Sequence, residues 1–305
     1  MAAKKLKASE RTTLLGKLTT QLKKRYGSKP HEPESPRAVL ETLLYGTLLE
    51  NAVDGQAEPA LTAMVAGFHD LNEIRVSSIR EIERTFPDLP EADWKSLRVK
   101  DALQHIFELN FTYDLDGLKK KAQEQAAGDL SEIPNSTPFM RLYVQQVGLG
   151  GHAMPVDRHQ LALLRWLGLT DAPATKEKKA KLEPEEVAAD ELKSAVRKSD
   201  GPLFAYLLRQ AANEPGVLAV TLAGPEDEAE ESEIEPKRRI AELDGLIEGT
   251  GAKRPQKAAK KESKASPAAE QAAAKGKTTK KAAAKKTSRK AARKVSKKAS
   301  KKTAK

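Results

Sequence analysis

Charge is distributed very unevenly along this chain of 305 residues. Residues 251–305 contain 21 Lys and Arg residues against two acidic ones, a net charge of +19. Since the whole chain carries +11, residues 1–250 carry −8. The basic segment consists mainly of Lys, Ala, Ser and Thr, with no aromatic residue and with Val295 as its only large aliphatic side chain. It cannot bury enough apolar surface to offset chain entropy, so we expect residues 251–305 to be disordered.

The same segment is suited to binding a polyanion. Each DNA phosphate that a Lys or Arg side chain neutralises releases counterions, and this binding is indifferent to base sequence. No aromatic side chain is present to stack on bases. We therefore predict non-specific DNA binding; the alternatives are a solubilising tail, or a tail that binds RNA or an anionic membrane. Its composition resembles that of linker-histone tails, and its densest basic run contains Lys285, Lys286, Arg289, Lys290, Arg293 and Lys294.

The composition also excludes several kinds of site. The chain has no Cys, so disulfides, thiolate zinc sites, cysteine nucleophiles and cysteine-held iron–sulfur clusters are excluded. His152 and His159 flank Asp157, but no further ligand is near in sequence, and we expect no metal and no cofactor. There is no apolar N-terminal stretch typical of a signal peptide, and no apolar run of about 20 residues. We expect a soluble intracellular monomer, in the cytoplasm and nucleoid or in the nucleus, without a membrane partner.

Apolar residues recur at helical spacing through most of residues 1–250, which predicts an all-α fold. Leu14, Leu15, Leu18 and Leu22 show the pattern most clearly. Residues 216–223 are the exception, a weak strand candidate. The expected helices span residues 9–26, 37–54, 59–68, 76–86, 91–109, 116–127, 139–147, 157–167, 184–197, 202–212 and about 240–247.

Breaks in this pattern divide the chain into four segments. Residues 1–35 form an N-terminal helix and a proline-rich connector, and residues 36–223 form the main helical domain. Residues 224–250 form an acidic linker with a short helix. Residues 251–305 form the basic tail.

Four short segments between Pro36 and Leu169 carry a family resemblance. They are Pro36 with residues 39–51 (Val-Leu-Glu-Thr-Leu-Leu-Tyr-Gly-Thr-Leu-Leu-Glu-Asn), residues 89–103, Ile133-Pro134, and Val156-Asp157-Arg158-His159. Together they resemble the helix-hairpin-helix base-excision DNA glycosylases of the endonuclease III type. The resemblance implies a two-lobed helical bundle, DNA as the partner, and hydrolysis of the N-glycosidic bond of a damaged base. Asp157 falls on the family's catalytic aspartate.

The chain departs from the family at its hairpin, where Leu-Pro-Gly-x-Gly-x-Lys is replaced by residues 133–139. Both glycines are absent, so the nest of backbone N–H groups that grips a phosphate is in doubt. Phe139 stands at the lyase lysine, 18 residues before Asp157, and cannot form a Schiff base. The resemblance therefore implies base removal without strand cleavage. Its candidate DNA contacts are Tyr45, Leu48 (at the family's gap-filling glutamine), Asn135, Ser136, Thr137 and Phe139.

Several of these residues also have a purely structural interpretation. Asp157 precedes a predicted helix and is a good N-cap, a role compatible with catalysis. Thr137 can cap a helix whose first residue is Pro138. Tyr45 can be buried packing, and we expect Trp94 and Trp166 in the core. Three functions stay open: a monofunctional DNA glycosylase with a tethering tail, a catalytically inactive DNA-binding or architectural protein on the same scaffold, and an adaptor for another protein.

Overall fold

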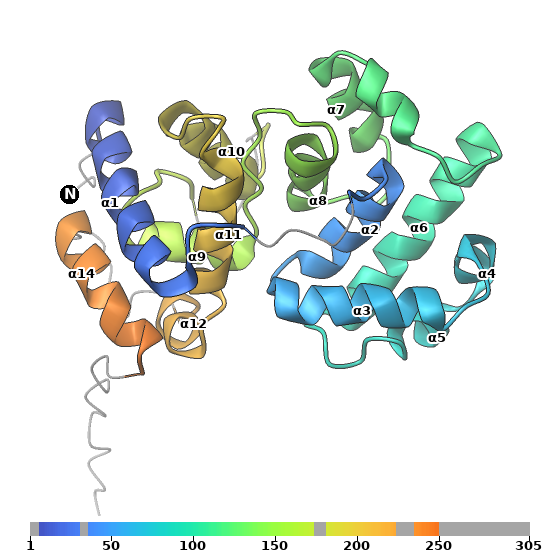
Figure 1. The fold of residues 1–305 in the computed structure, drawn as a ribbon, viewed down its shortest axis with the longest axis horizontal. Coiled ribbons are helices and arrows are strands. Elements are labelled where there is room, and N and C mark those ends of the chain that lie inside the picture. Colours follow the sequence, from blue (N-terminus) through green and yellow to red (C-terminus); the bar gives the residue numbers. More distant parts are fainter. Residues whose placement is uncertain (1–5, 31–35, 174–180, 224–234, 250–305) are drawn as a thin grey trace, which may run out of the picture. The chain divides into compact units, whose positions relative to one another are not determined.

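The computed structural model describes residues 6–30, 36–173, 181–223 and 235–249. In these ranges every regular element is helical and no strand occurs, which confirms the all-α prediction (Figure 1). The basic tail, residues 224–234 of the acidic segment and residues 31–35 of the proline-rich connector lie outside the described residues. No helix in the described ranges is long and apolar enough to cross a membrane.

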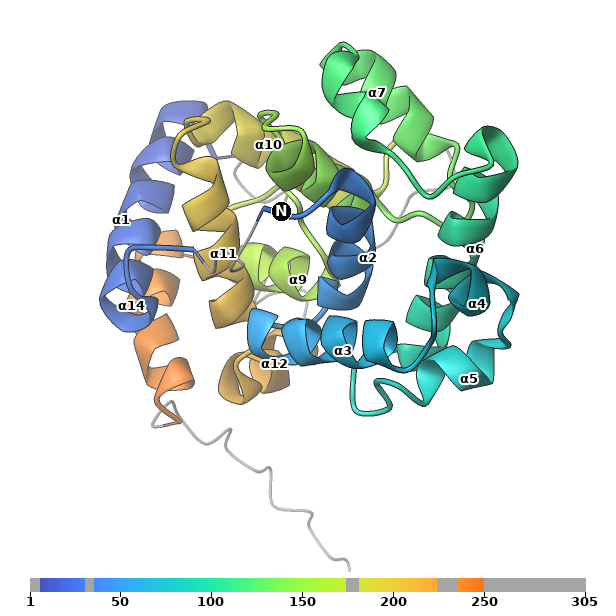
Figure 2. The ribbon, with the colours of Figure 1, turned by 45° about the vertical axis from the view of Figure 1, so that its right-hand side comes forward.

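One apolar core organises the helices of a first lobe. Helix α2 lies at its centre, and every α2 residue except Glu41 is buried. The neighbouring helices surround it (Figure 2), and their buried apolar residues form one core with those of α2. The first lobe consists of α2 (Val39–Leu49), α3 (Asp54–Ala66), α4 (Leu71–Val76), α5 (Ile79–Glu83), α6 (Ala92–Asn110), a 3-10 turn (Asp116–Lys120), α7 (Gln123–Ser131), α8 (Pro138–Tyr143) and a π-helical turn (Val144–Gly148).

A second apolar core organises the other lobe and joins elements from both ends of the described chain. The leucines of α1 pack into it as their spacing predicts, and the buried face of α14 packs beside them. Both views show α1 and α14 side by side (Figures 1 and 2), and the Gln21 side chain donates to the Ile240 carbonyl at 2.8 Å. The second lobe consists of α1 (Ala8–Tyr26), α9 (Arg158–Trp166), α10 (Pro184–Ala195), α11 (Gly201–Ala212), α12 (Pro215–Thr221) and α14 (Pro236–Ile247).

The weak strand prediction for residues 216–223 is wrong, because this segment contains helix α12. Its short apolar run fits a strand and a buried helix equally well. Pro215 occupies the first helical turn, where its missing N–H costs nothing. Gly216 is needed for packing rather than for extended structure: a Cβ there would lie 2.2 Å from the Leu246 carbonyl oxygen of α14.

Three predicted helix boundaries are also corrected. The helix expected over residues 76–86 is replaced by α4 and α5, because the Ser78 side chain accepts from the Glu81 N–H and starts a new helix. Residues 116–127 form the 3-10 turn followed by the start of α7. Helix α3 begins at Asp54, five residues before the expected Pro59, where the Gln56 side chain accepts from the Val53 N–H at 3.2 Å.

Candidate functional site at the junction of the two lobes

The Asp157 carboxylate lies where the two lobes meet. Its Oδ1 accepts from the Gln160 N–H at 2.8 Å, and the Gln160 side chain accepts from the Asp157 N–H, so Asp157 caps α9 as predicted. Its Oδ2 accepts from the Asn51 N–H, just beyond α2, at 3.0 Å. Asp157 is 1% exposed. One carboxylate thus satisfies a backbone donor from each lobe.

Asn51 connects this carboxylate to the start of α6. Its backbone is in the left-handed region, with φ of 55°, and its side-chain amide donates to Glu91 at 3.1 Å. Glu91 is also left-handed, with φ of 56°, and its carboxylate pairs with Arg158 at 3.3 Å. The buried Oδ1 of Asn51 has no hydrogen-bond partner among the described residues. Left-handed backbone is uncommon at non-glycine residues, and here two such residues lie in contact at the lobe junction, one of them an Asn directly after a helix end, where this conformation is common.

Glu50 is a second carboxyl at the same junction. Its Oε2 accepts from Arg98 at 2.8 Å and from the Thr137 hydroxyl at 3.1 Å. Burial raises the pKa of Glu50 to about 7; Arg98 opposes the increase and the negative charge of Asp157 adds to it. Near neutral pH this carboxyl therefore exists in both protonation states.

Lys95 places a buried amine beside these carboxyls. Its side chain is fully buried, and Nζ donates to the Leu48 carbonyl at 2.9 Å, near the end of α2. Burial lowers the pKa of Lys95 to about 8, against the attraction of Glu50, Glu91 and Asp157. Nothing in the sequence marks Glu50, Lys95 or Arg98 as site residues, because only the fold brings them to Asp157.

We call Glu50, Asn51, Lys95, Arg98 and Asp157 the junction cluster. It contains two carboxyls, one amine and one guanidinium, drawn from the end of α2, the first half of α6 and the cap of α9. Buried acid–base groups with pKa values near neutrality are typical of active sites. No group of three or more His, Asp or Glu side chains in the described part of the chain is placed to hold a metal ion.

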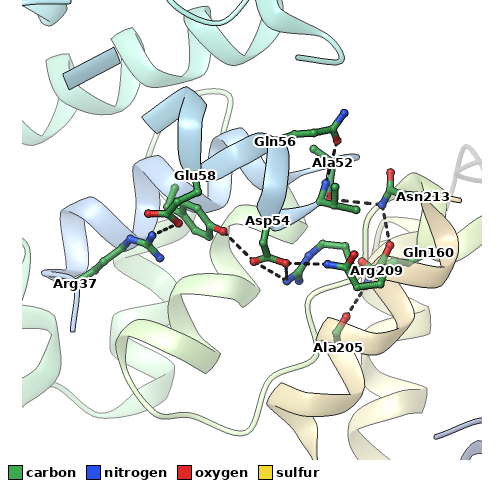
Figure 3. Close-up of polar contacts among 12 residues, drawn as sticks. Arg37, Ala52, Asp54, Gln56, Glu58, Gln160, Ala205, Arg209 and Asn213 are labelled. Atoms are coloured by element: carbon green, nitrogen blue, oxygen red, sulfur yellow. Dashed lines mark hydrogen bonds and ion pairs between the residues drawn. The ribbon is translucent and has the colours of Figure 1, made fainter. Parts of the chain in front are cut away.

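A second polar contact holds the lobes together beside this cluster (Figure 3). Arg209 of α11 donates to both oxygens of Asp54 at the start of α3, at 2.9 and 3.2 Å. The Tyr45 hydroxyl donates to the same carboxylate at 2.8 Å, and the Gln210 amide does so at 3.1 Å. Burial alone would lower the pKa of Arg209, but Asp54 and nearby tyrosines raise it, so the guanidinium stays charged.

Asn213 adds a further link between the lobes. Its amide donates to the Ala52 carbonyl in the first lobe at 3.4 Å and to the Arg209 carbonyl at 2.9 Å (Figure 3). Its Oδ1 lies 2.8 Å from Nδ1 of His159, which therefore acts as the donor. His159 thus contributes to the contact between α9 and the end of α11 and is not placed as a metal ligand.

Three of the proposed DNA contacts lie in the core of the first lobe. Tyr45 and Leu48 have no exposed surface, and Phe139 is 1% exposed and stacks on Tyr143 with ring centroids 6.0 Å apart. In this structure neither the Leu48 nor the Phe139 side chain reaches the surface, and their expected DNA contacts stay predictions. Leu48 lies on the buried face of α2, and Phe139 lies on the buried face of α8. The helical spacing of apolar residues predicts packing in the core at such positions rather than contact with DNA.

The segment at the altered hairpin makes local contacts. Asn135, with φ of 56°, donates to Asp101 at 2.6 Å, and the Ser136 hydroxyl donates to the Leu130 carbonyl at 3.3 Å. Thr137 caps α8 by accepting from the Met140 N–H at 3.2 Å, as predicted. Its hydroxyl proton goes to Glu50. The hairpin thus supports the junction cluster.

Trp94 does not lie in the core, contrary to the sequence-based expectation. It is 55% exposed and lies in the first turn of α6, three residues after Glu91. The buried face of α6 runs through Lys95, Ser96 and Val99, so Trp94 points elsewhere. Trp166 is half-buried, with the Arg239 guanidinium 4.8 Å from its ring centroid. Trp94 thus provides an exposed aromatic surface in the first turn of α6, the helix that follows Glu91.

No protein-family model matches the chain, and no curated protein matches it at a significant level. Several solved structures are similar in fold. A trapped endonuclease III–DNA covalent intermediate has 12% identity and a TM-score of 0.48, covering 67% of this chain and 85% of that one. The Clostridium acetobutylicum 8-oxoguanine glycosylase/lyase in complex with DNA has 14% identity and a TM-score of 0.46, covering 68% and 70%. A thermostable thymine-DNA glycosylase has 11% identity and a TM-score of 0.47, covering 74% and 94%.

We predict that Arg209→Met lowers the free energy of unfolding by about 3–5 kcal/mol, because it leaves the buried Asp54 without its guanidinium. The matched control is Arg238→Met, which removes an exposed partner of Glu242 and should cost less than about 1 kcal/mol. Urea denaturation of the three proteins measures both values. Equal, small losses in the two variants would show that the lobes do not depend on the Asp54–Arg209 pair.

Proposed function

We propose that this chain is a DNA-binding protein of base-excision repair that hydrolyses the N-glycosidic bond of a damaged base and leaves the strand intact. The observation that supports it most is the junction cluster. It buries Asp157 beside Glu50 and Lys95, whose pKa values are shifted to about 7 and about 8. Groups that titrate near the working pH are the ones that serve as acids and bases in catalysis.

Asp157 can act in this reaction through its charge. As the base departs with the electron pair of the C1′–N bond, the sugar becomes positive, and a fixed negative charge nearby lowers the barrier. The N–H groups of Gln160 and Asn51 hold the carboxylate in place. Phe139 has no amine, so no Schiff base forms at that position and the strand is not cut there.

The target base must leave the DNA stack to reach such a cluster. Asp157 is covered in the present structure, so binding requires the junction to open. Arg158, next to Asp157 in the chain, and Trp94, next to Lys95 in the chain, are both exposed, and an aromatic ring with a guanidinium suits an unstacked base and a phosphate. We propose that DNA approaches on this side.

One observation favours the second candidate, a catalytically inactive DNA-binding protein on the same scaffold. Both oxygens of Asp157 accept backbone N–H groups, and its side chain is almost fully covered. A capping role alone would produce the same geometry. Activity on damaged DNA therefore decides between the two candidates.

We predict that the protein releases at least one base from duplexes that carry uracil, an oxidised pyrimidine or an alkylated purine. Strand breaks after alkali treatment measure the abasic sites. Asp157→Asn should lower the release about 100- to 1,000-fold, since a preorganised charge is lost. Asp190→Asn, on the exposed face of α10, is the matched control and should leave it unchanged. Thermal melting checks that both variants fold. If the wild-type protein releases no base from any of these lesions, the glycosylase proposal is wrong and the inactive DNA-binding protein is the remaining candidate.

We also propose that residues 251–305 hold the protein on DNA through charge. If about half of the 21 cationic side chains contact phosphates, a plot of log affinity for undamaged duplex against log salt should have a slope of roughly −9. Fluorescence anisotropy at several salt concentrations measures this slope. A protein ending at Thr250 should lose most of the affinity and of the slope. If the truncated protein binds as tightly, with the same slope, the basic segment is not the DNA-binding element.

A further inference from the structure

We infer that Glu50, rather than Asp157, is the carboxyl that exchanges a proton with the departing base. This inference rests on the proposed base excision and assigns its acid–base step. The two carboxyls belong to one junction, because Glu50 directly precedes Asn51, whose N–H binds Asp157. Their surroundings differ in two respects that give them different chemical roles.

The first difference is access. Both hydrogen bonds that Glu50 makes within the described residues fall on Oε2, from Arg98 and from Thr137. Its Oε1 accepts no hydrogen bond from the described residues, and Glu50 is 8% exposed. Asp157 has both oxygens engaged and is 1% exposed. Of the two carboxyls, only Glu50 has an oxygen available to a substrate atom.

The second difference is protonation. The charged groups that face Glu50 are Arg98 and Lys95 from α6, which favour its carboxylate form, and Asp157 from the cap of α9, which disfavours it. Burial outweighs the two cations, so the pKa of Glu50 rises to about 7. A carboxyl of this kind can hold a proton at neutral pH and still release it. Two carboxyls with such different surroundings are typical of an acid and a charge stabiliser acting together.

The resulting step balances. The C1′–N bond breaks, its electron pair goes to the base nitrogen, and the Glu50 O–H proton is transferred to the base. The negative charge of Asp157 stabilises the positive sugar in the meantime. A water oxygen then bonds to C1′, and one of its protons returns to the Glu50 carboxylate. The products are the free base and an abasic sugar, and Glu50 is protonated again.

The test compares Glu50→Gln with wild type in single-turnover release of the base over about pH 5 to about pH 9. The amide oxygen of Gln can still accept from Arg98 and Thr137, so the fold should persist, and thermal melting verifies this. We expect the wild-type rate to fall as pH rises through about 7, where Glu50 loses its proton. Glu50→Gln should be slower by about 100- to 10,000-fold and lose this dependence. Glu41→Gln, on the exposed face of the same helix, should match wild type in both respects.

The effect of Glu50→Gln on two kinds of departing base distinguishes a proton donor from a residue that only supports the structure. A 7-alkylated purine departs as a neutral base and needs no proton, so Glu50→Gln should slow its release far less than that of a base that needs one. Equal losses on both kinds of lesion would overturn the proton-donor role.

The outcomes separate this inference from the proposed function. If wild type releases a base and Glu50→Gln keeps its rate and pH profile, the Glu50 assignment falls while base excision stands. If wild type releases nothing, both fall. If Glu50→Gln does not fold, the wild-type profile decides: a decline through about pH 7 supports the assignment, and a rate that does not change there overturns it.

Discussion

The structure depends on a carboxylate that is shared between two separately packed lobes. Asp157 accepts one backbone N–H from the helix it caps and one from Asn51, just beyond the central helix of the other lobe. Each lobe has its own apolar core, and Leu142 of α8 also packs against the core of the second lobe. Two buried directional contacts join the lobes as well, at Asp157 and at the Asp54–Arg209 pair nearby. Because both contacts are buried, breaking either leaves a polar group unsatisfied.

The same junction contains groups that a purely structural interface does not need. An ionised carboxyl and an ammonium lose hydration on burial, so the pKa of Glu50 rises and that of Lys95 falls. Asn51 and Glu91 add left-handed backbone beside them. Replacing such buried charged groups by apolar residues of similar size often leaves a protein equally stable or more stable. Two residues with left-handed backbone and several ionisable ones lie together at this place, and the proposed chemistry rests on that arrangement.

Helices and helix caps could be predicted from the sequence, because they depend on residues that are close together along the chain. Helical spacing of leucines predicted α1, and the local capping pattern predicted the roles of Asp157 and Thr137. It did not reveal Glu50, Lys95 and Arg98 as a cluster, because their proximity to Asp157 arises only when α2, α6 and α9 pack. The position of Trp94 in an apolar-periodic helix predicts a core residue, whereas the buried face of α6 excludes it. Residues 216–223 are a weak strand candidate from the sequence, but they contain α12, where the Leu246 carbonyl of a helix far along the chain requires the small size of Gly216.

The central claim is that the lobe junction contains a carboxyl able to donate a proton at neutral pH. Carbon-13 NMR of the glutamate side-chain carboxyls, followed over pH in wild type and in Glu50→Gln, tests it most directly. We expect one carboxyl resonance with a midpoint near pH 7 that is absent from the variant. If every glutamate carboxyl titrates near its ordinary value of about 4.3, the lobe junction holds no carboxyl that can donate a proton at neutral pH, and the role assigned to Glu50 is wrong.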